Sequence, residues 1–195
     1  MGTTNKIKYG LSNAHYAVAT IAANGSATYA TPVALPGSVS MSLGAEGDIT
    51  EEWADDILWA ELNESNGYSG DLELEIVPDS FLKDVLGYKE DANGILYEDA
   101  DAPVVHFALL YEFSGDVHKT RRVLYNCVSK RPAEGSKTKT RNIEVQHETL
   151  SLVATSIYNA SVNKNVPKAK AVPTDLEYNG WYSAVYQPTA VAATT

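Results

Sequence analysis

The histidines, the cysteine and the carboxylates are the side chains of this sequence that could perform chemistry, and none of them stands in a catalytic motif. None of the four histidines belongs to the H-x-x-x-H or H-x-H pairs that commonly bind zinc. The single cysteine, Cys127, lies in an apolar pattern typical of a buried strand, where a thiol packs rather than reacts. Walker-type, G-x-G-x-x-G and G-x-S-x-G motifs are absent from the sequence. We therefore expect no enzyme, no metal and no cofactor.

The acidic side chains are numerous, but their spacing suits a charged surface better than a reaction. Asp71, Glu73 and Glu75 alternate with apolar residues at positions 72, 74 and 76. Two such carboxylates could act as a glycosidase pair. Three at even spacing on one strand face rather predict a row of charge facing water, with the apolar residues in the core. The acids at 91–101 do not keep the spacing of a calcium-binding EF-hand.

The charge is distributed unevenly along the chain. The net charge of −10 argues against ordinary nucleic-acid binding, which depends on positive charge. Residues 46–116 contain twenty acidic and two basic residues, whereas residues 117–170 contain eleven basic and three acidic ones. An acidic face and a basic face on one small domain would suit head-to-tail assembly, and uneven solvated surfaces are the alternative.

The hydrophobic period of two predicts a mainly-β fold. We expect strands at 15–21, 27–35, 38–43, 68–77, 104–113, 117–130 and 141–154, with hairpin turns at 24–25 and 91–94. One helix is predicted at about residues 80–86, with Asp79 as its N-cap and Gly87 after its end. Its apolar residues should pack on a sheet.

Two segments fit no compact element. Residues 46–66 are predicted as a long loop, which is acidic yet contains Trp53 and Trp59. Burial against a partner is the natural use of such a loop, and folding over its own core is the alternative. Residues 163–173 are rich in lysine and proline and predict an extended linker to a tyrosine-rich tail. We expect a β-sandwich domain at 1–155 and an extended C-terminal arm at 156–195.

The sequence contains no apolar run near the roughly 20 residues that span a bilayer. Its first residues lack the apolar stretch of a signal peptide. Together with the single cysteine, these features predict folding in a reducing cytoplasm and no membrane insertion.

An ordered series of segments across nearly the whole chain resembles the phi13-type phage major tail proteins, the tail tube proteins of long-tailed, non-contractile bacteriophages. The likeness is weakest at 137–142 and 156–175. The segments that carry it are KIKYGLSNAHYA (6–17), PGSVSMSL (36–43), NGYSGDLE (66–73), PDSFL (78–82), FALLYEF (107–113), RVLYNC (122–127), ETL (148–150) and YNGW (178–181).

This resemblance implies a β-sandwich or barrel of the tail tube type with one flanking helix. It also implies that six subunits pool strands into an inner barrel and that the rings stack into a hollow tube. Such a tube would assemble in the bacterial host cytoplasm and become part of the virion tail. Its implied partners are other copies of the chain, the tape measure protein and the tail terminator and initiator proteins. Double-stranded DNA would pass through the tube without specific binding.

Three sets of residues receive roles under this interpretation. An acidic lumen would repel phosphate, and its candidates are Asp71, Glu73 and Glu75. The candidates for contact with a neighbouring subunit are Trp53, Ile57, Leu58, Trp59 and Leu62. The basic candidates for ring stacking are Lys119, Arg121, Arg122, Lys130, Arg131, Lys137, Lys139 and Arg141.

Two other interpretations remain open from the sequence. A carbohydrate-binding or receptor-binding β-sandwich of a virion would use aromatic platforms, although no predicted strand face carries an aromatic row. The inner tube of a contractile injection system would share the fold.

Overall fold

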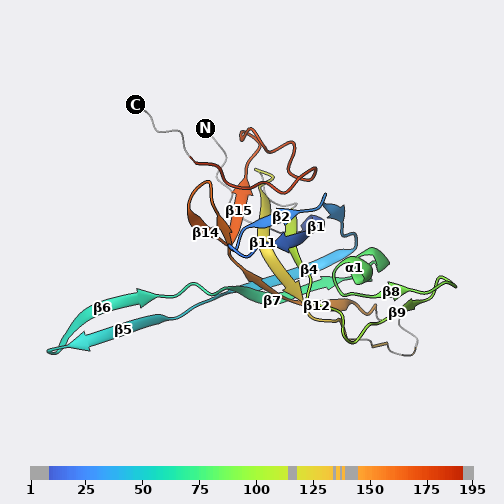
Figure 1. The fold of residues 1–195 in the computed structure, drawn as a ribbon, viewed down its shortest axis with the longest axis horizontal. Coiled ribbons are helices and arrows are strands. Elements are labelled where there is room, and N and C mark those ends of the chain that lie inside the picture. Colours follow the sequence, from blue (N-terminus) through green and yellow to red (C-terminus); the bar gives the residue numbers. More distant parts are fainter. Residues whose placement is uncertain (1–8, 114–117, 134, 137, 139–144, 191–195) are drawn as a thin grey trace.

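The computed structural model describes residues 9–113, 118–133, 135–136, 138 and 145–190, and it confirms a mainly-β fold with one short helix (Figure 1). Most of its strands join one large antiparallel sheet. The elements are β1 (Leu11–Ile21), β2 (Ala27–Tyr29), β3 (Val33–Ala34), β4 (Ser38–Glu46), β5 (Ile49–Ala54), β6 (Ile57–Asn63), β7 (Gly67–Leu74), α1 (Asp79–Asp84), β8 (Lys89–Glu90), β9 (Leu96–Tyr97), β10 (His106–Phe113), β11 (Arg121–Ser129), β12 (Glu148–Thr155), β13 (Ile157–Asn159), β14 (Lys164–Val166) and β15 (Lys168–Ala171).

The large sheet has the strand order β2-β1-β10-β11-β12-β7-β4, with β3 beside β1 and β15 beside β11. Two strands share one edge of β11. Residues 126–129 of β11 pair with β12, and residues 121–124 pair with β15. The sheet therefore divides along β11, and its two branches leave that strand at different points.

Strands β1, β10 and β11 are buried on both faces, so they form the central layer. The sequence of strand β10 explains why both of its faces are buried. Phe107 and Leu109 enter one core, and Ala108 and Leu110 enter the other. An uninterrupted apolar run is the pattern of a strand covered on both sides. The first core lies between this layer, β12, β7, β4 and α1. The second core lies under the C-terminal segment, which we define as residues 157–187.

Helix α1 covers the first core with one aromatic side chain. Phe81 is fully buried and meets the ring of Tyr16 edge-on, with centroids 5.1 Å apart. The Tyr16 hydroxyl donates to Asp84 Oδ2 at 2.8 Å, which ties the helix to β1. The helix begins earlier than expected, because the Pro78 carbonyl already accepts from the Phe81 amide at 2.9 Å. Asp79 therefore lies in the first turn rather than at the N-cap, where Pro78 stands.

The predicted strand at 68–77 is shorter in the structure, and one of its inward residues was assigned wrongly. Strand β7 ends at Leu74, after which the Glu75 amide donates to the Gly37 carbonyl at 2.8 Å. The change of direction leaves Ile76 71% exposed and buries Val77 in its place. The period of two thus predicted the buried Leu72 and Leu74 but failed where the strand stopped.

Residues beyond 155 contain further strands. The segment expected as a linker, 163–173, contains β14 and β15, and β15 joins the large sheet through β11. The following turns bury Tyr178 and Trp181 in the second core. The division of the chain at residue 155 remains a prediction.

Candidate functional site

Six of the exposed large apolar side chains lie close together in sequence, on an arm that projects from the body, the rest of the described chain (Figure 1). We define the arm as residues 46–66, which contain β5 and β6. These strands pair only with each other, separately from the large sheet. The expected irregular loop is therefore a β-hairpin, and no other described element covers its two strands.

An unusual turn joins the two strands. Asp55 and Asp56 have φ angles of 51° and 63°. Two consecutive positive φ values are the geometry of a type I′ turn, which suits the twist of a two-residue hairpin. Aspartate tolerates this conformation better than most residues, although glycine or asparagine is the common choice. The turn therefore lacked the Asn-Gly or Asp-Gly signal that would have predicted a hairpin here.

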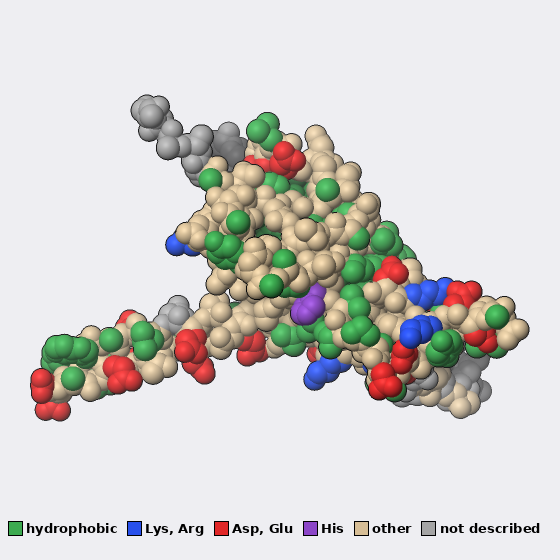
Figure 2. All heavy atoms as spheres, in the orientation of Figure 1, with side chains coloured by type: hydrophobic (Ala, Val, Ile, Leu, Met, Phe, Trp, Pro, Cys, Tyr) green, Lys and Arg blue, Asp and Glu red, His purple; other side chains and the backbone are tan. Residues whose placement is uncertain are grey.

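The apolar side chains of the arm are exposed, as the hydrophobic groups near its tip in Figure 2 show. Trp53 is 63% exposed and Trp59 is 69% exposed. Leu58 stands opposite Trp53, and Ile57 stands opposite Ala54, so both strands contribute to the apolar tip. Leu62 is exposed nearer the base. A two-stranded hairpin is marginally stable alone, and exposed apolar side chains gathered at one end of it mark an interaction surface.

The same arm is strongly anionic. Residues 46–66 include eight acidic residues and no basic one. Among them, Glu51 accepts a hydrogen bond from Trp53 Nε1 at 3.2 Å. A partner for this surface must therefore offer apolar groups together with positive charge.

Backbone hydrogen bonds continue from the body into the base of the arm. The Asn66 amide donates to the Glu46 carbonyl at 2.8 Å, and the Glu64 amide donates to the Asp48 carbonyl at 3.0 Å. Gly47 adopts a φ of 150°, and a Cβ there would lie 1.9 Å from the Glu64 carbonyl oxygen. The arm is thus an extension of the β4–β7 pair, and glycine is needed for the close approach of its two chains.

Two of the predicted lumen residues lie on the outer face of β7. Asp71 accepts from the Ser151 hydroxyl at 2.8 Å, and Glu73 accepts from the Ser40 hydroxyl at 2.6 Å. These serines belong to the strands on either side, so this face of β4, β7 and β12 is polar and acidic. Glu75 lies beyond the strand end, 3.4 Å from His147 Nδ1.

The five described residues of the predicted basic set lie near the two ends of β11. Arg121 lies at the start of β11 beneath the C-terminal segment, and Arg122 donates to the Thr120 carbonyl at 3.0 Å. Arg131 lies past the other end of β11 and pairs with Glu98. Lys119 and Lys130 are exposed. Three further candidates lie outside the described residues, namely Lys137, Lys139 and Arg141.

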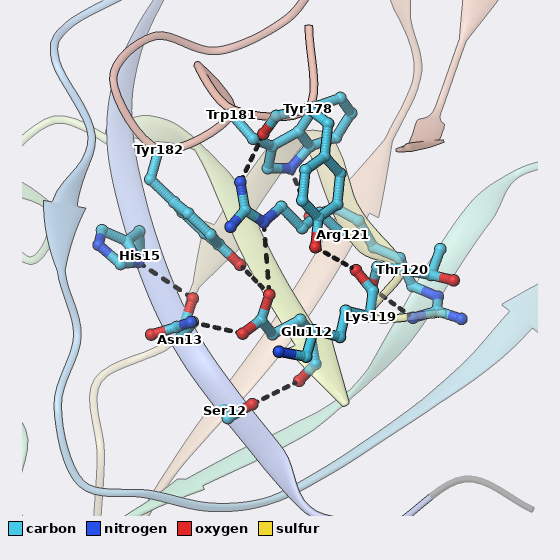
Figure 3. Close-up of polar contacts among 11 residues, drawn as sticks. Ser12, Asn13, His15, Glu112, Lys119, Thr120, Arg121, Tyr178, Trp181 and Tyr182 are labelled. Carbon is cyan, nitrogen blue, oxygen red and sulfur yellow. Dashed lines mark hydrogen bonds and ion pairs between the residues drawn. The ribbon is translucent and has the colours of Figure 1, made fainter. Parts of the chain in front are cut away.

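Sequence reasoning missed the cluster that holds the C-terminal segment to the body (Figure 3). The Arg121 guanidinium lies 3.9 Å from the centre of the Tyr178 ring and 4.9 Å from that of Tyr182. Its Nε is 3.5 Å from Glu112 Oε2, and Tyr182 donates to the same oxygen at 3.4 Å. Trp181 donates through Nε1 to the Arg122 carbonyl at 3.4 Å. These contacts join residues far apart in sequence. The tyrosine-rich tail was the one feature of the local sequence that pointed to the cluster.

The single cysteine is buried in the first core. Burial raises the pKa of the Cys127 thiol to about 12, so the nucleophilic thiolate is disfavoured. Within the described ranges, no group of three histidine, cysteine, aspartate or glutamate side chains could hold a metal ion. Among the same residues, no helix has the length and apolarity to span a membrane.

Comparison with protein-family models and with curated proteins gives no match. Among solved structures, the chain is similar to a chain of the anti-feeding prophage (AFP) baseplate, determined by cryo-electron microscopy with six-fold symmetry applied. The two share 12% sequence identity with a TM-score of 0.40, and the alignment covers 87% of this chain and 97% of the other.

Proposed function

We propose that this protein is the tail tube subunit of a long-tailed bacteriophage, a structural protein that assembles with copies of itself. The observation that carries the proposal is the arm at 46–66, with its exposed tryptophans at Trp53 and Trp59. A projecting apolar hairpin adds no buried surface to a monomer, whereas a subunit that buries it against a neighbour gains binding free energy from it. The ordered resemblance to the phi13-type major tail proteins points to the same role.

The open edges of the sheet suit assembly into a barrel. Strand β4 ends the strand order on one side, and β2 and β3 lie at the other. An unpaired edge readily accepts another strand, and closure of a barrel across subunits would remove such edges. We propose rings of six subunits, with Asp71 and Glu73 lining the lumen. Their charge would keep double-stranded DNA from adhering as it passes through the tube.

The proposed partners follow from this role. The tube would surround the tape measure protein during assembly in the host cytoplasm, and terminator and initiator proteins would close its ends. Of the stacking candidates, Lys119 and Lys130 are exposed, so we propose them for the basic face.

Negative-stain electron microscopy of the purified protein tests the proposal. At high protein concentration, we expect hollow rings or tubes of uniform width, with a salt dependence that reflects the acidic arm. Solid irregular aggregates would contradict it. A persistent monomer that binds glycans through Trp53 and Trp59 would instead favour a carbohydrate-binding module, which these exposed rings could also serve.

A further inference from the structure

A groove of about 550 Å³ opens where β12 and β15 separate along β11. Its volume falls within the range of about 300–1,000 Å³ that encloses a compact ligand or a few side chains. Strands β4, β7, β10, β11 and β15 all contribute to it. The lining residues are Met41, Leu43, Tyr68, Tyr111, Phe113, Arg122, Val123, Leu124, Lys168, Ala169 and Lys170.

The groove combines an apolar floor with a positively charged rim. Met41 and Leu43 face inward from β4 and are only partly buried, so the first core is open at this end. The Lys168 ammonium lies 4.4 Å from the centre of the Tyr68 ring, and the Arg122 guanidinium lies 4.8 Å from that of Phe113. The described residues that line the groove include three basic side chains and no acidic one.

This chemistry is the complement of the arm. The arm offers exposed indole and aliphatic side chains among eight carboxylates, whereas the groove offers apolar and aromatic walls beneath basic groups. Apolar contact would supply affinity, and the opposite charges would orient the two surfaces.

The arm of a chain does not reach the groove of the same chain. Its base adjoins the groove, because Ala45 pairs with Tyr68, a residue of the groove wall. From there the strands run away from the body (Figure 1), and the eight residues from Ala45 to Trp53, at roughly 3.3 Å each, place Trp53 about 26 Å away. An arm that fills this groove must therefore come from another copy of the chain.

We infer that this groove receives the tip of the arm, with Trp53, Leu58 and Trp59, from a second copy of the chain. The inference rests on the proposed self-assembly and adds its receiving site. Because arm and groove are different surfaces, the contact is head-to-tail. Contacts of this kind repeat from copy to copy and generate rings or filaments.

Charge reversal on the groove rim tests the inference without touching the core. Lys168 is exposed on β15, and Lys164 is exposed on β14 outside the groove, so Lys164→Glu is a control with the same change of charge. We expect K168E to weaken self-association at least about tenfold, with the affinity of K164E unchanged, as measured by sedimentation equilibrium.

A mixture of two variants isolates the single contact. The W53A/W59A variant retains the groove, and the K168E/K170E variant retains the arm. Each alone should sediment as a monomer with a native circular dichroism spectrum, whereas the mixture should form a one-to-one dimer. A mixture that stays monomeric would overturn the inference.

The outcomes separate the inference from the function on which it rests. If wild type and K168E/K170E assemble equally well while W53A/W59A does not, the arm has another receiving site and the proposed function survives. If the wild-type chain sediments as a monomer at every protein and salt concentration, the proposed function and this contact both fail.

Discussion

Two aromatic segments lie outside the strands predicted from the sequence, and the structure places their side chains in opposite environments. In the C-terminal segment, Trp181 is 2% exposed, whereas Trp59 of the arm is 69% exposed. The C-terminal segment finds partners within its own chain, because Arg121 lies between the rings of Tyr178 and Tyr182. The arm carries only negative charge, and none of the other described elements covers it. Aromatic content alone therefore does not distinguish a core segment from an interface segment. The difference depends on whether the rest of the chain offers groups that can pack against the aromatic rings.

The largest expected difference between the two segments is in how much a tryptophan of each contributes to the free energy of unfolding of the monomer. Trp181→Ala should lower the free energy of unfolding by about 3–5 kcal/mol, because it leaves a cavity in the second core. Trp59→Ala should change the free energy of unfolding of the monomer by less than about 0.5 kcal/mol, because the side chain is exposed. Urea unfolding of both variants, below the concentration of assembly, checks the contrast. Equal losses of unfolding free energy in the two variants would contradict the contrast between a buried and an exposed tryptophan.

A smaller effect tests the polar contacts that hold the C-terminal segment. Arg121→Ala should cost about 2 kcal/mol, since it removes two cation–π contacts and leaves the half-buried Glu112 without its ion pair. Arg131→Ala is the matched control and should cost less than about 1 kcal/mol, because its pair with Glu98 is exposed. The comparison uses urea unfolding at low salt. An R121A loss no greater than that of R131A would show that the segment is held by apolar contacts alone.

Alkaline pH should lower the free energy of unfolding, because the buried Cys127 thiol resists losing its proton in the native state. Burial raises the pKa of the Cys127 thiol from 9.0 to about 12, so the native state favours the protonated form. The corresponding stability is complete below pH 9 and is lost as pH rises toward 12. Between pH 9 and 10, this group alone should cost about 1 kcal/mol. Cys127→Ala should therefore show a shallower decline in unfolding free energy over this interval, and an unchanged slope would exclude the thiol as a cause.

The smallest expected effect is that of the arm on the stability of the monomer. W53A/W59A should change the midpoint of thermal unfolding by less than about 2 °C, because neither side chain belongs to a core. Differential scanning calorimetry of dilute protein checks this. A loss comparable to that of W181A would mean that the arm stabilises its own chain.

The sequence predicted most of the β-structure, because period-two alternation is a local signal. The buried Leu72 and Leu74 were predicted in this way, and the short helix was predicted within a few residues. The hairpin of the arm was missed, since the Asp55–Asp56 turn lacks glycine and the strands do not alternate cleanly. The groove could not be predicted, because its walls come from five strands that only the folded sheet brings together.

The candidate site was predicted only in part. Trp53 and Trp59 were selected from their apolar character in an acidic segment, and the structure places both on an exposed surface. Their role in contact with a neighbouring subunit remains a prediction. The internal role of Arg121 was not predicted, because its partners at 112, 178 and 182 lie in other segments of the chain.

The central claim is that the arm drives assembly, and sedimentation velocity tests it most directly. Wild type, W53A/W59A and the control variant I76A/L176A would be compared at one high protein concentration. The control removes apolar side chains that are exposed on the body, since Ile76 is 71% and Leu176 is 98% exposed. We predict that wild type and the control sediment as rings or tubes, whereas W53A/W59A sediments as a folded monomer. If W53A/W59A assembles as wild type does, the claim is contradicted.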